Sequence, residues 1–274
     1  MKTEGEKAEL AAEVLDYVRG HRYKVKIDEV LGERKQDPRG KSIIEYLRRH
    51  VLVRGMSVLE LGCAAGARLR EVQWELSLLG GGPSRRGNLT GVDLVPGWIE
   101  AARKAVPGVT FACADATDVD LGRRYDLIIL SDVIEHVLIE RYVCLARTIT
   151  NHASKRAAVY LHTPSPETQL LDQHGGERNQ SQFFENTIPH HTLVLLFARF
   201  GFQLENFEYD QITDCGRPGE DRGLVTAGRG AKCVFADGTP KFTNMLFRRV
   251  SNPAVLQMSM RSGLSARRTF NLCI

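Results

Sequence analysis

Residues 57–66, with the sequence SVLELGCAAG, decide the fold of this chain. The apolar run from Met56 to Leu61 predicts a short buried strand, and the small residues after it predict a tight turn. The helical pattern that follows places four apolar residues on one face: Leu69, Val72, Leu76 and Leu79. A strand, a small-residue turn and a helix in this order present backbone N–H groups to a ligand in α/β proteins.

The composition fits one large globular domain. The chain has 274 residues, of which 43% are hydrophobic and 26% charged, enough to build a core that folds unaided. A net charge of +4 is too small to indicate a nucleic-acid partner. No apolar run approaches the roughly 18 residues that a membrane span needs. We therefore expect a small-molecule partner, and neither nucleic acid nor a membrane.

The termini and cysteines favour a cytoplasmic protein. Residues 1–9 are charged and lack the apolar centre of a signal peptide. The six cysteines are scattered without a Cys-x-x-Cys pair. Several of them, among them Cys63, Cys113 and Cys144, fall in segments that look buried. We expect reduced, structural thiols.

The glycine-spaced turn is compatible with two ligands. Gly62-x-Ala64-x-x-Ala67 is a degenerate dinucleotide fingerprint. Glu60-x-Gly62-x-x-x-Gly66 resembles motif I of the class I S-adenosylmethionine (SAM) methyltransferases. Ala64 stands where that family has its second glycine. Gly62 allows a positive φ, Gly66 allows close backbone approach, and the carboxylate of Glu60 is expected to point at the turn.

Acidic residues follow the next three predicted strands. The strand over 89–93 ends in Asp93, the strand over 109–113 leads to Asp115, and the strand over 125–130 leads to residues 131–137, SDVIEHV. Ligands of open parallel sheets bind at the carboxyl ends of the strands, so these side chains are expected at one edge. A dinucleotide-binding site would account for Gly62 and Asp93, but it would not account for the segment over residues 131–137.

The order of these motifs resembles the class I SAM methyltransferases over roughly residues 50–210. Asp132-x-x-Glu135-His136 resembles their motif after the fourth strand in the ubiquinone-biosynthesis-like and related members (methyltransferase types 11, 12 and 23). The resemblance implies an α/β, Rossmann-like sandwich: a mostly parallel seven-stranded sheet with helices on both faces, N-terminal helices and a C-terminal hairpin.

Three parts of the chain are expected. Residues 1–52 form a helical extension, either a lid over the cofactor or packing at the sheet edge, with helices over 7–19 and around Ile43 to Val51. Residues 53–250 form the SAM-binding domain, and residues 251–274 a tail. The hairpin is predicted from 232–235 and 244–248, which flank Asp237-Gly238.

The resemblance implies SAM as the cofactor and assigns a role to each residue at this edge. The cofactor-binding set is Glu60, Gly62, Cys63, Ala64, Gly66, Asp93, Leu94, Trp98, Asp115, Ala116 and Ser131. Within it, Asp93 is expected to hold the ribose diol, Asp115 the adenine amino group and Trp98 the adenine ring. A structural turn for Asp115 and a core position for Trp98 are the plain alternatives.

Methyl transfer needs few catalytic residues, because the sulfide is a good leaving group and positioning supplies much of the rate. His136 is the candidate general base, although it equally fits a role in shaping the pocket. The substrate-binding candidates are Asp132, Glu135, His162, His190 and His191. No metal is expected.

The predicted function is methyl transfer to an oxygen or nitrogen of a small organic molecule, a metabolite or a glycan-linked sugar. A first alternative is a metal-dependent RNA 2′-O-methyltransferase, because Asp132, Glu135 and His136 with His190 or His191 supply two acids and two histidines. A second is an inactive SAM-binding regulatory protein, which only Ala64 favours.

Overall fold

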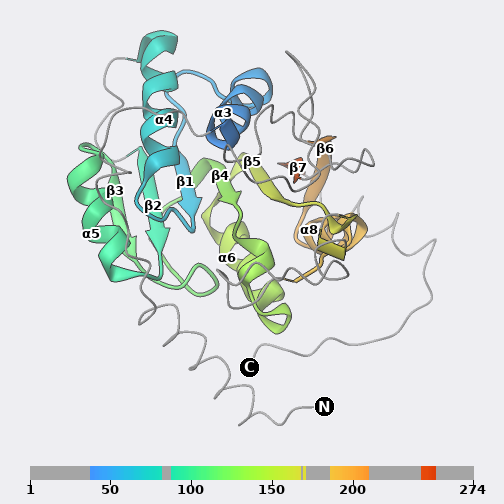
Figure 1. The fold of residues 1–274 in the computed structure, drawn as a ribbon. Helices are drawn as coiled ribbons and strands as arrows, with labels where there is room; N and C mark the ends of the chain where they lie inside the picture. Colours follow the sequence, from blue (N-terminus) through green and yellow to red (C-terminus); the bar gives the residue numbers. More distant parts are fainter. Residues whose placement is uncertain (1–37, 82–87, 168, 171–185, 210–241, 251–274) are drawn as a thin grey trace, which may run out of the picture.

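The computed structural model of the chain describes residues 38–81, 88–167, 169–170, 186–209 and 242–250. Seven strands of this part form one sheet in the order β3-β2-β1-β4-β5-β7-β6 (Figure 1). Their bounds are β1 Val58–Leu61, β2 Leu89–Asp93, β3 Thr110–Cys113, β4 Tyr125–Ser131, β5 Ala153–Pro164, β6 Phe202–Tyr209 and β7 Phe242–Arg249. All four residues of β1 are buried, as expected for a central strand covered on both faces.

Helices cover both faces of the sheet (Figure 1). They are α3 Pro38–His50, α4 Ala67–Leu76, α5 Pro96–Ala105, α6 Tyr142–His152 and α8 His190–Arg199, with one π turn, η1 Ser77–Gly81, after α4. The core on one face includes residues of α3, α4 and α5, and the core on the other includes residues of α6 and α8. The predicted Rossmann-like sandwich is therefore confirmed.

The C-terminal strand differs from the prediction. Residues 244–248 do form a strand, but β7 lies inside the main sheet, antiparallel to both β5 and β6. Its first six residues are buried, because its side chains reach the cores on both faces. A strand buried on both faces belongs in the interior of a sheet. The predicted hairpin partner over 232–235 and the turn at Asp237-Gly238 lie outside the described residues.

The chain between β4 and α6 is not one continuous α-helix. Two 3₁₀ turns, η2 (Ile134–His136) and η3 (Ile139–Arg141), precede α6. The Asn186 side chain donates hydrogen bonds to the carbonyls of Glu135 and Val137, which are thereby used outside any α-helix. Strand β5 follows α6 directly and begins at Ala153.

Polar contacts join helix α3 to β6, a strand at the edge of the sheet. The Tyr46 hydroxyl donates to Asn206 Oδ1 at 2.7 Å, and Arg49 and His50 lie 3.0 and 2.9 Å from the Glu208 carboxylate. The buried face of α3 includes Ile43 and Leu47. The packing alternative therefore holds for this helix. The predicted helix over 7–19 and the tail over 251–274 lie outside the described residues.

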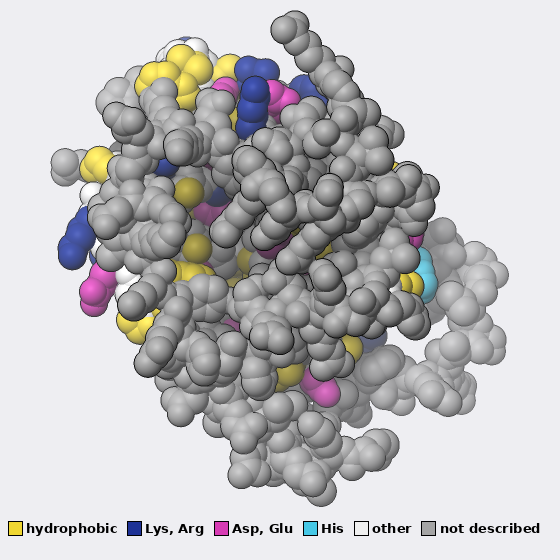
Figure 2. All heavy atoms as spheres, in the orientation of Figure 1, with side chains coloured by type: hydrophobic (Ala, Val, Ile, Leu, Met, Phe, Trp, Pro, Cys, Tyr) yellow, Lys and Arg dark blue, Asp and Glu magenta, His cyan; other side chains and the backbone are white. Residues whose placement is uncertain are grey.

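Among the described residues, no helix combines the length and apolar character needed to cross a membrane. Exposed apolar side chains at the end of α4 and in η1 include Trp74, Leu78 and Leu79, and Figure 2 shows hydrophobic side chains at the top of the view, over this end of the molecule.

Cys63 and Cys113 are free thiols, but Cys144 is disulfide-bonded, so the expectation of reduced thiols is wrong there. The sequence has no Cys-x-x-Cys spacing that would have predicted this disulfide.

Candidate cofactor and acceptor site

The predicted turn and the segment after β4 meet at the point where the strand order reverses. Strand β1 pairs with β2 on one side and with β4 on the other, and crevices at such points bind ligands in open α/β sheets. A Cβ atom placed on Gly62 would lie 2.3 Å from Val133 Cγ2. The turn after β1 and the loop after β4 are thus packed directly together.

The turn owes its shape to three left-handed residues. The φ angles are 76° at Gly62, 44° at Ala64 and 81° at Gly66. Gly62 and Cys63 both donate their N–H groups to the carbonyl of Val92, at 2.8 and 2.9 Å. This ties the turn to the end of β2.

One glycine beneath the turn was not singled out from the sequence. A Cβ on Gly91 would lie 2.7 Å from Cys63 Sγ and 2.8 Å from Leu69 Cδ1. Only glycine therefore lets β2 approach the turn so closely. The position of this glycine inside a predicted strand is the sequence signal that could have indicated the close approach.

The carboxylate of Asp93 braces the turn at the end of β2. Oδ2 accepts the N–H of Ala64 at 2.8 Å, and Oδ1 accepts the N–H of Val95 at 2.9 Å. Burial raises the pKa of Asp93, and the hydrogen bonds from Val95 and Ala64 offset part of that rise. Each carboxylate oxygen can accept a second hydrogen bond, so the group retains the capacity to hold a diol.

The loop after β3 forms the turn that the plain alternative predicted. Asp115 Oδ1 accepts hydrogen bonds from the N–H and the hydroxyl of Thr117, at 2.8 and 2.7 Å. Asp115 Oδ2 lies 3.3 Å from Arg141, a residue without a signal in the sequence. The neighbouring candidates Ala116, Leu94 and Trp98 are half-buried. Trp98 lies in the first turn of α5.

Glu60 is buried on the face that α4 covers. The residue is 3% exposed, and its side-chain atom Oε2 has no hydrogen-bond partner. Burial raises its pKa to about 8, the nearby Asp93 and Glu71 add to this, and Arg68 opposes it. Burial thus favours the neutral form of Glu60, where a charged carboxylate pointing at the turn was expected.

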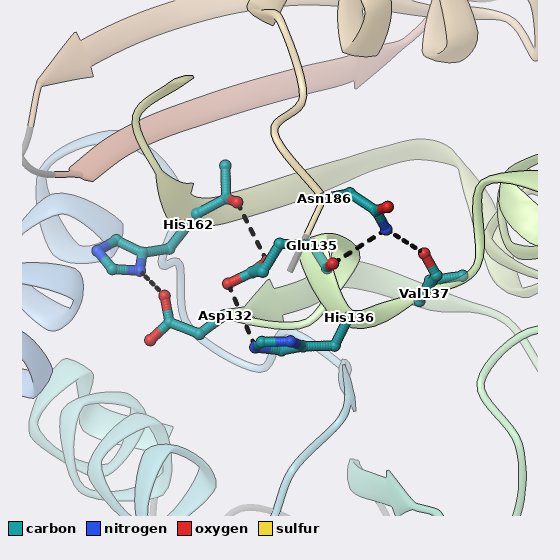
Figure 3. A network of polar contacts seen from close by, with 7 residues as sticks. Asp132, Glu135, His136, Val137, His162 and Asn186 are labelled. Atoms are coloured by element: carbon teal, nitrogen blue, oxygen red, sulfur yellow. Dashed lines mark hydrogen bonds and ion pairs between the residues drawn. The ribbon is translucent and has the colours of Figure 1, made fainter. Parts of the chain in front are cut away.

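Asp132 and His162 form a direct pair after β4 (Figure 3). His162 Nδ1 lies 2.8 Å from Asp132 Oδ1, and the Asp132 N–H donates to the His162 carbonyl at 2.8 Å. His162 is completely buried, whereas the Asp132 side chain is 24% exposed. Ser131, the last residue of β4, is half-buried and stands opposite His162 in the sheet.

Glu135 turns inward beside this pair (Figure 3). Its Oε2 accepts the Thr163 hydroxyl at 3.1 Å, and burial, with the charge of Asp132, raises its pKa to about 8. His136 Nε2 lies 3.9 Å from Glu135 Oε1, which is longer than a hydrogen bond. Glu135 instead points inward toward Thr163. Asn186 and Thr163 complete this group and were not predicted.

The two remaining histidine candidates lie at the start of α8. His190 stacks edge-on against Phe207 and Tyr209, with ring centroids 4.9 and 6.2 Å apart, and burial lowers its pKa. His191 is exposed. Within the part of the chain that the structure describes, no three His, Cys, Asp or Glu side chains are grouped to hold a metal ion. The predicted set of two acids and two histidines is not assembled there.

Residues 28–206 match the family model of the methyltransferase domain. The chain belongs to this methyltransferase family. A comparison with curated proteins finds no match. The resemblance that the motif order indicated is confirmed.

Solved structures share the fold of this methyltransferase at low identity. The magnesium protoporphyrin IX methyltransferase of Synechocystis PCC 6803 with bound SAM is 14% identical, with a TM-score of 0.53 over 87% of this chain and 96% of that one. A SAM-dependent methyltransferase of Mesorhizobium loti is 19% identical, with a TM-score of 0.54 over 76% and 98%. An N-methyltransferase of Bradyrhizobium japonicum WM9 is 15% identical, with a TM-score of 0.51 over 78% and 98%.

Methyltransferases of this family use SAM as their cofactor. The residues of this methyltransferase fit that group. A turn with left-handed residues lies at the switch point of the sheet. Asp93 is held beside this turn by the N–H of Ala64, and its carboxylate can accept further hydrogen bonds from the two hydroxyls of a ribose. Gly62 and Gly66 are required by packing as well, because Val133 and Phe111 fill the space that their side chains would take.

Proposed function

We propose that this protein transfers a methyl group from SAM to a nitrogen or oxygen atom of a small organic molecule. One observation carries the proposal. The turn braced by Asp93 lies at the switch point of the sheet and packs through Gly62 against Val133, within the polar segment 131–136. A cofactor site and a set of acceptor-binding side chains are thereby adjacent.

In this proposal SAM, when bound, would supply the methyl group as a sulfonium, in which the sulfide is a good leaving group. The protein holds the cofactor through the turn over 62–66, with Asp93 at the ribose and the loop of Asp115 and Ala116 at the adenine. Cys63, Leu94, Trp98 and Ser131 complete the proposed cofactor contacts. An acceptor held in line needs no further activation if it is a neutral amine, whereas a hydroxyl must lose a proton.

His136 is proposed as the group that takes that proton. Its side chain is 30% exposed, so it is open to an acceptor, while the adjacent Glu135 is fully buried. Glu135 is not proposed as the base, because it is fully buried and its Oε2 accepts the hydroxyl of Thr163 inside the protein. Its proposed part, like that of Asp132 and His162, is to build the acceptor side of the site, with His190 and His191 further along at α8.

Ala64, the residue that favoured an inactive SAM-binding regulatory protein, does not alter the shape of the turn. Ala64 adopts φ 44°, so the turn keeps its left-handed step even without the second glycine. The proposed acceptor is small rather than RNA, since the composition lacks a strongly basic balance.

Calorimetric titration of the protein with SAM, its demethylated product S-adenosylhomocysteine (SAH) and NAD tests the cofactor. Binding of the first two without NAD is the expected result. Tight NAD binding with no response to SAM would refute the proposal. A methyl-release screen over amines, phenols and sugars then tests the acceptor class, and requirement for an added divalent metal on an RNA acceptor would replace the small-molecule proposal by the RNA one.

A further inference from the structure

Asp132 is held in a conformation that few aspartates adopt. Its φ is 54°, in the left-handed region that residues other than glycine adopt uncommonly. Two contacts with the same residue stabilise it: the Asp132 N–H donates to the His162 carbonyl, and Asp132 Oδ1 accepts from His162 Nδ1 (Figure 3). Backbone outliers that the surroundings hold in place cluster at functional sites.

His162 is a rigid anchor for this carboxylate. It lies in β5 between β4 and β7, opposite Ser131 and Asn244, and is completely buried. Its ring stacks on Phe242 with centroids 5.0 Å apart. Because an ionised carboxylate only accepts hydrogen bonds, Nδ1 of His162 carries the proton of the shared bond. The imidazole is thus fixed in tautomer and in orientation.

The pair has one member inside the protein and one at its surface. His162 cannot touch a ligand, whereas the Asp132 side chain is 24% exposed. The next residue, Val133, packs against Gly62 of the cofactor turn. Asp132 therefore lies between the turn and the end of β5, on the side of the cofactor where the acceptor is proposed to bind. The neighbouring Glu135 is fully buried, so it is Asp132 that presents a carboxyl group at the surface of this segment.

We propose that Asp132 accepts a hydrogen bond from the N–H or O–H of the atom to be methylated, and that His162 is the positioning residue that holds Asp132 for this contact. The inference rests on the proposed function, because it assumes SAM in the turn. It adds a polar contact on the acceptor side that the cofactor residues do not supply.

The SAM analogue sinefungin tests this placement without a known acceptor, because a carbon bearing an amine replaces its methylated sulfur. The amine then occupies the place of the transferred methyl group. Calorimetry gives the ratio of the SAH and sinefungin dissociation constants for each variant. We expect wild-type protein to prefer sinefungin by roughly 10-fold, the effect of one hydrogen bond to a charged group.

The variant Asp132→Asn keeps a residue that tolerates the left-handed region and an oxygen for His162, but it removes the charge. We expect the preference to fall to about one while SAH affinity stays within about 2-fold. His162→Leu should weaken the preference, and His162→Asn, whose amide replaces Nδ1–H, should restore part of it. Asp126→Asn, at the opposite edge of the sheet, should keep the wild-type ratio.

Two results would overturn the inference: a wild-type ratio near one, or an unchanged ratio in Asp132→Asn. A protein that binds neither SAH nor sinefungin would instead overturn the proposed function, and the inference with it. Retained SAH binding therefore separates the two failures.

Discussion

Val133 occupies the space that a side chain on Gly62 would need. A Cβ atom on Gly62 would lie 2.3 Å from Val133 Cγ2, and real Cβ atoms essentially never come so close to another atom. The contact packs the turn after β1 against the loop after β4, so the proposed cofactor and acceptor elements are direct neighbours.

Gly62→Ala should destabilise the protein and reduce SAM affinity. The left-handed φ of 76° and the clash with Val133 each add a cost, together about 2–5 kcal/mol in unfolding free energy. Adding Val133→Ala should recover the steric part and leave the conformational part. Gly97→Ala is the control, since nothing lies within 4 Å of its Cβ position. Equal denaturation midpoints for wild type and Gly62→Ala would contradict the packing described.

Ala64→Gly should stabilise the protein. Ala64 has a φ of 44°, so glycine relieves about 1–2 kcal/mol of strain, partly offset by the added freedom of the unfolded chain. The matched control is Ala65→Gly, where φ is not positive and a buried methyl group is lost; it should destabilise. Chemical denaturation measures both variants. A less stable Ala64→Gly protein would show that the methyl group of Ala64 contributes more than its strain costs.

Asp93→Ala should weaken SAM binding by about 2–4 kcal/mol, because two charge-assisted hydrogen bonds to the ribose are lost. It should also lower stability, since the N–H groups of Ala64 and Val95 lose their acceptor. Asp126→Ala separates the two effects. Asp126 likewise accepts hydrogen bonds from Ser57, but at the opposite edge of the sheet, so its loss should reduce stability alone. Unchanged calorimetric affinity in Asp93→Ala would remove the ribose assignment.

Glu60→Gln should flatten the decline of stability with rising pH. The pKa of Glu60 is raised from its ordinary value of 4.5 to about 8, so between these values the folded state holds a proton that the unfolded state has lost. The unfolding free energy therefore falls as pH rises through this window. Glu135, with its pKa also near 8, adds to the same slope. Denaturation from pH 5 to pH 8 measures it, and identical slopes in variant and wild type would mean that Glu60 is charged when folded.

His136→Asn should lower kcat by about 10²–10⁴-fold on a hydroxyl acceptor and leave SAM affinity nearly intact. Asparagine keeps polarity and removes basicity. A loss confined to acceptor KM would indicate that His136 shapes the pocket instead. Near-normal kcat from pH 6 to about pH 9, which spans the reference pKa of histidine, would exclude the role of base.

The strands and the glycine turn were predictable because central parallel strands are apolar on both faces and stand out in the sequence. The run from Met56 to Leu61 therefore located β1, and the acids after β2, β3 and β4 located one sheet edge. The place of β7 was not predictable, since its pairing with β5 joins residues such as His162 and Asn244 that lie far apart in the chain.

Within the site, the residues were predictable but several of their roles were not. Glu60 was expected to point a charged carboxylate at the turn and Glu135 to bind the acceptor, and both are buried, which raises their pKa values to about 8. The partners Thr163 and Asn186 come from segments 28 and 51 residues away from Glu135 and follow no local pattern. Burial and long-range contacts are set by packing, which composition and spacing do not report.

The antiparallel pairing of β6 with β7 has a practical consequence. Tyr209 and Thr243 are register partners, so the chain leaves the sheet after β6 and returns to it at the same place. Tyr209 and Thr243 are therefore close together, and each doubling of the length of a connection between them costs only about 0.6 kcal/mol in chain entropy. This junction lies at the edge of the sheet that carries Asp132, because Phe242 pairs with Pro164 and its ring stacks on His162. A reporter domain inserted there would therefore lie beside the proposed acceptor site, where it could report on acceptor binding.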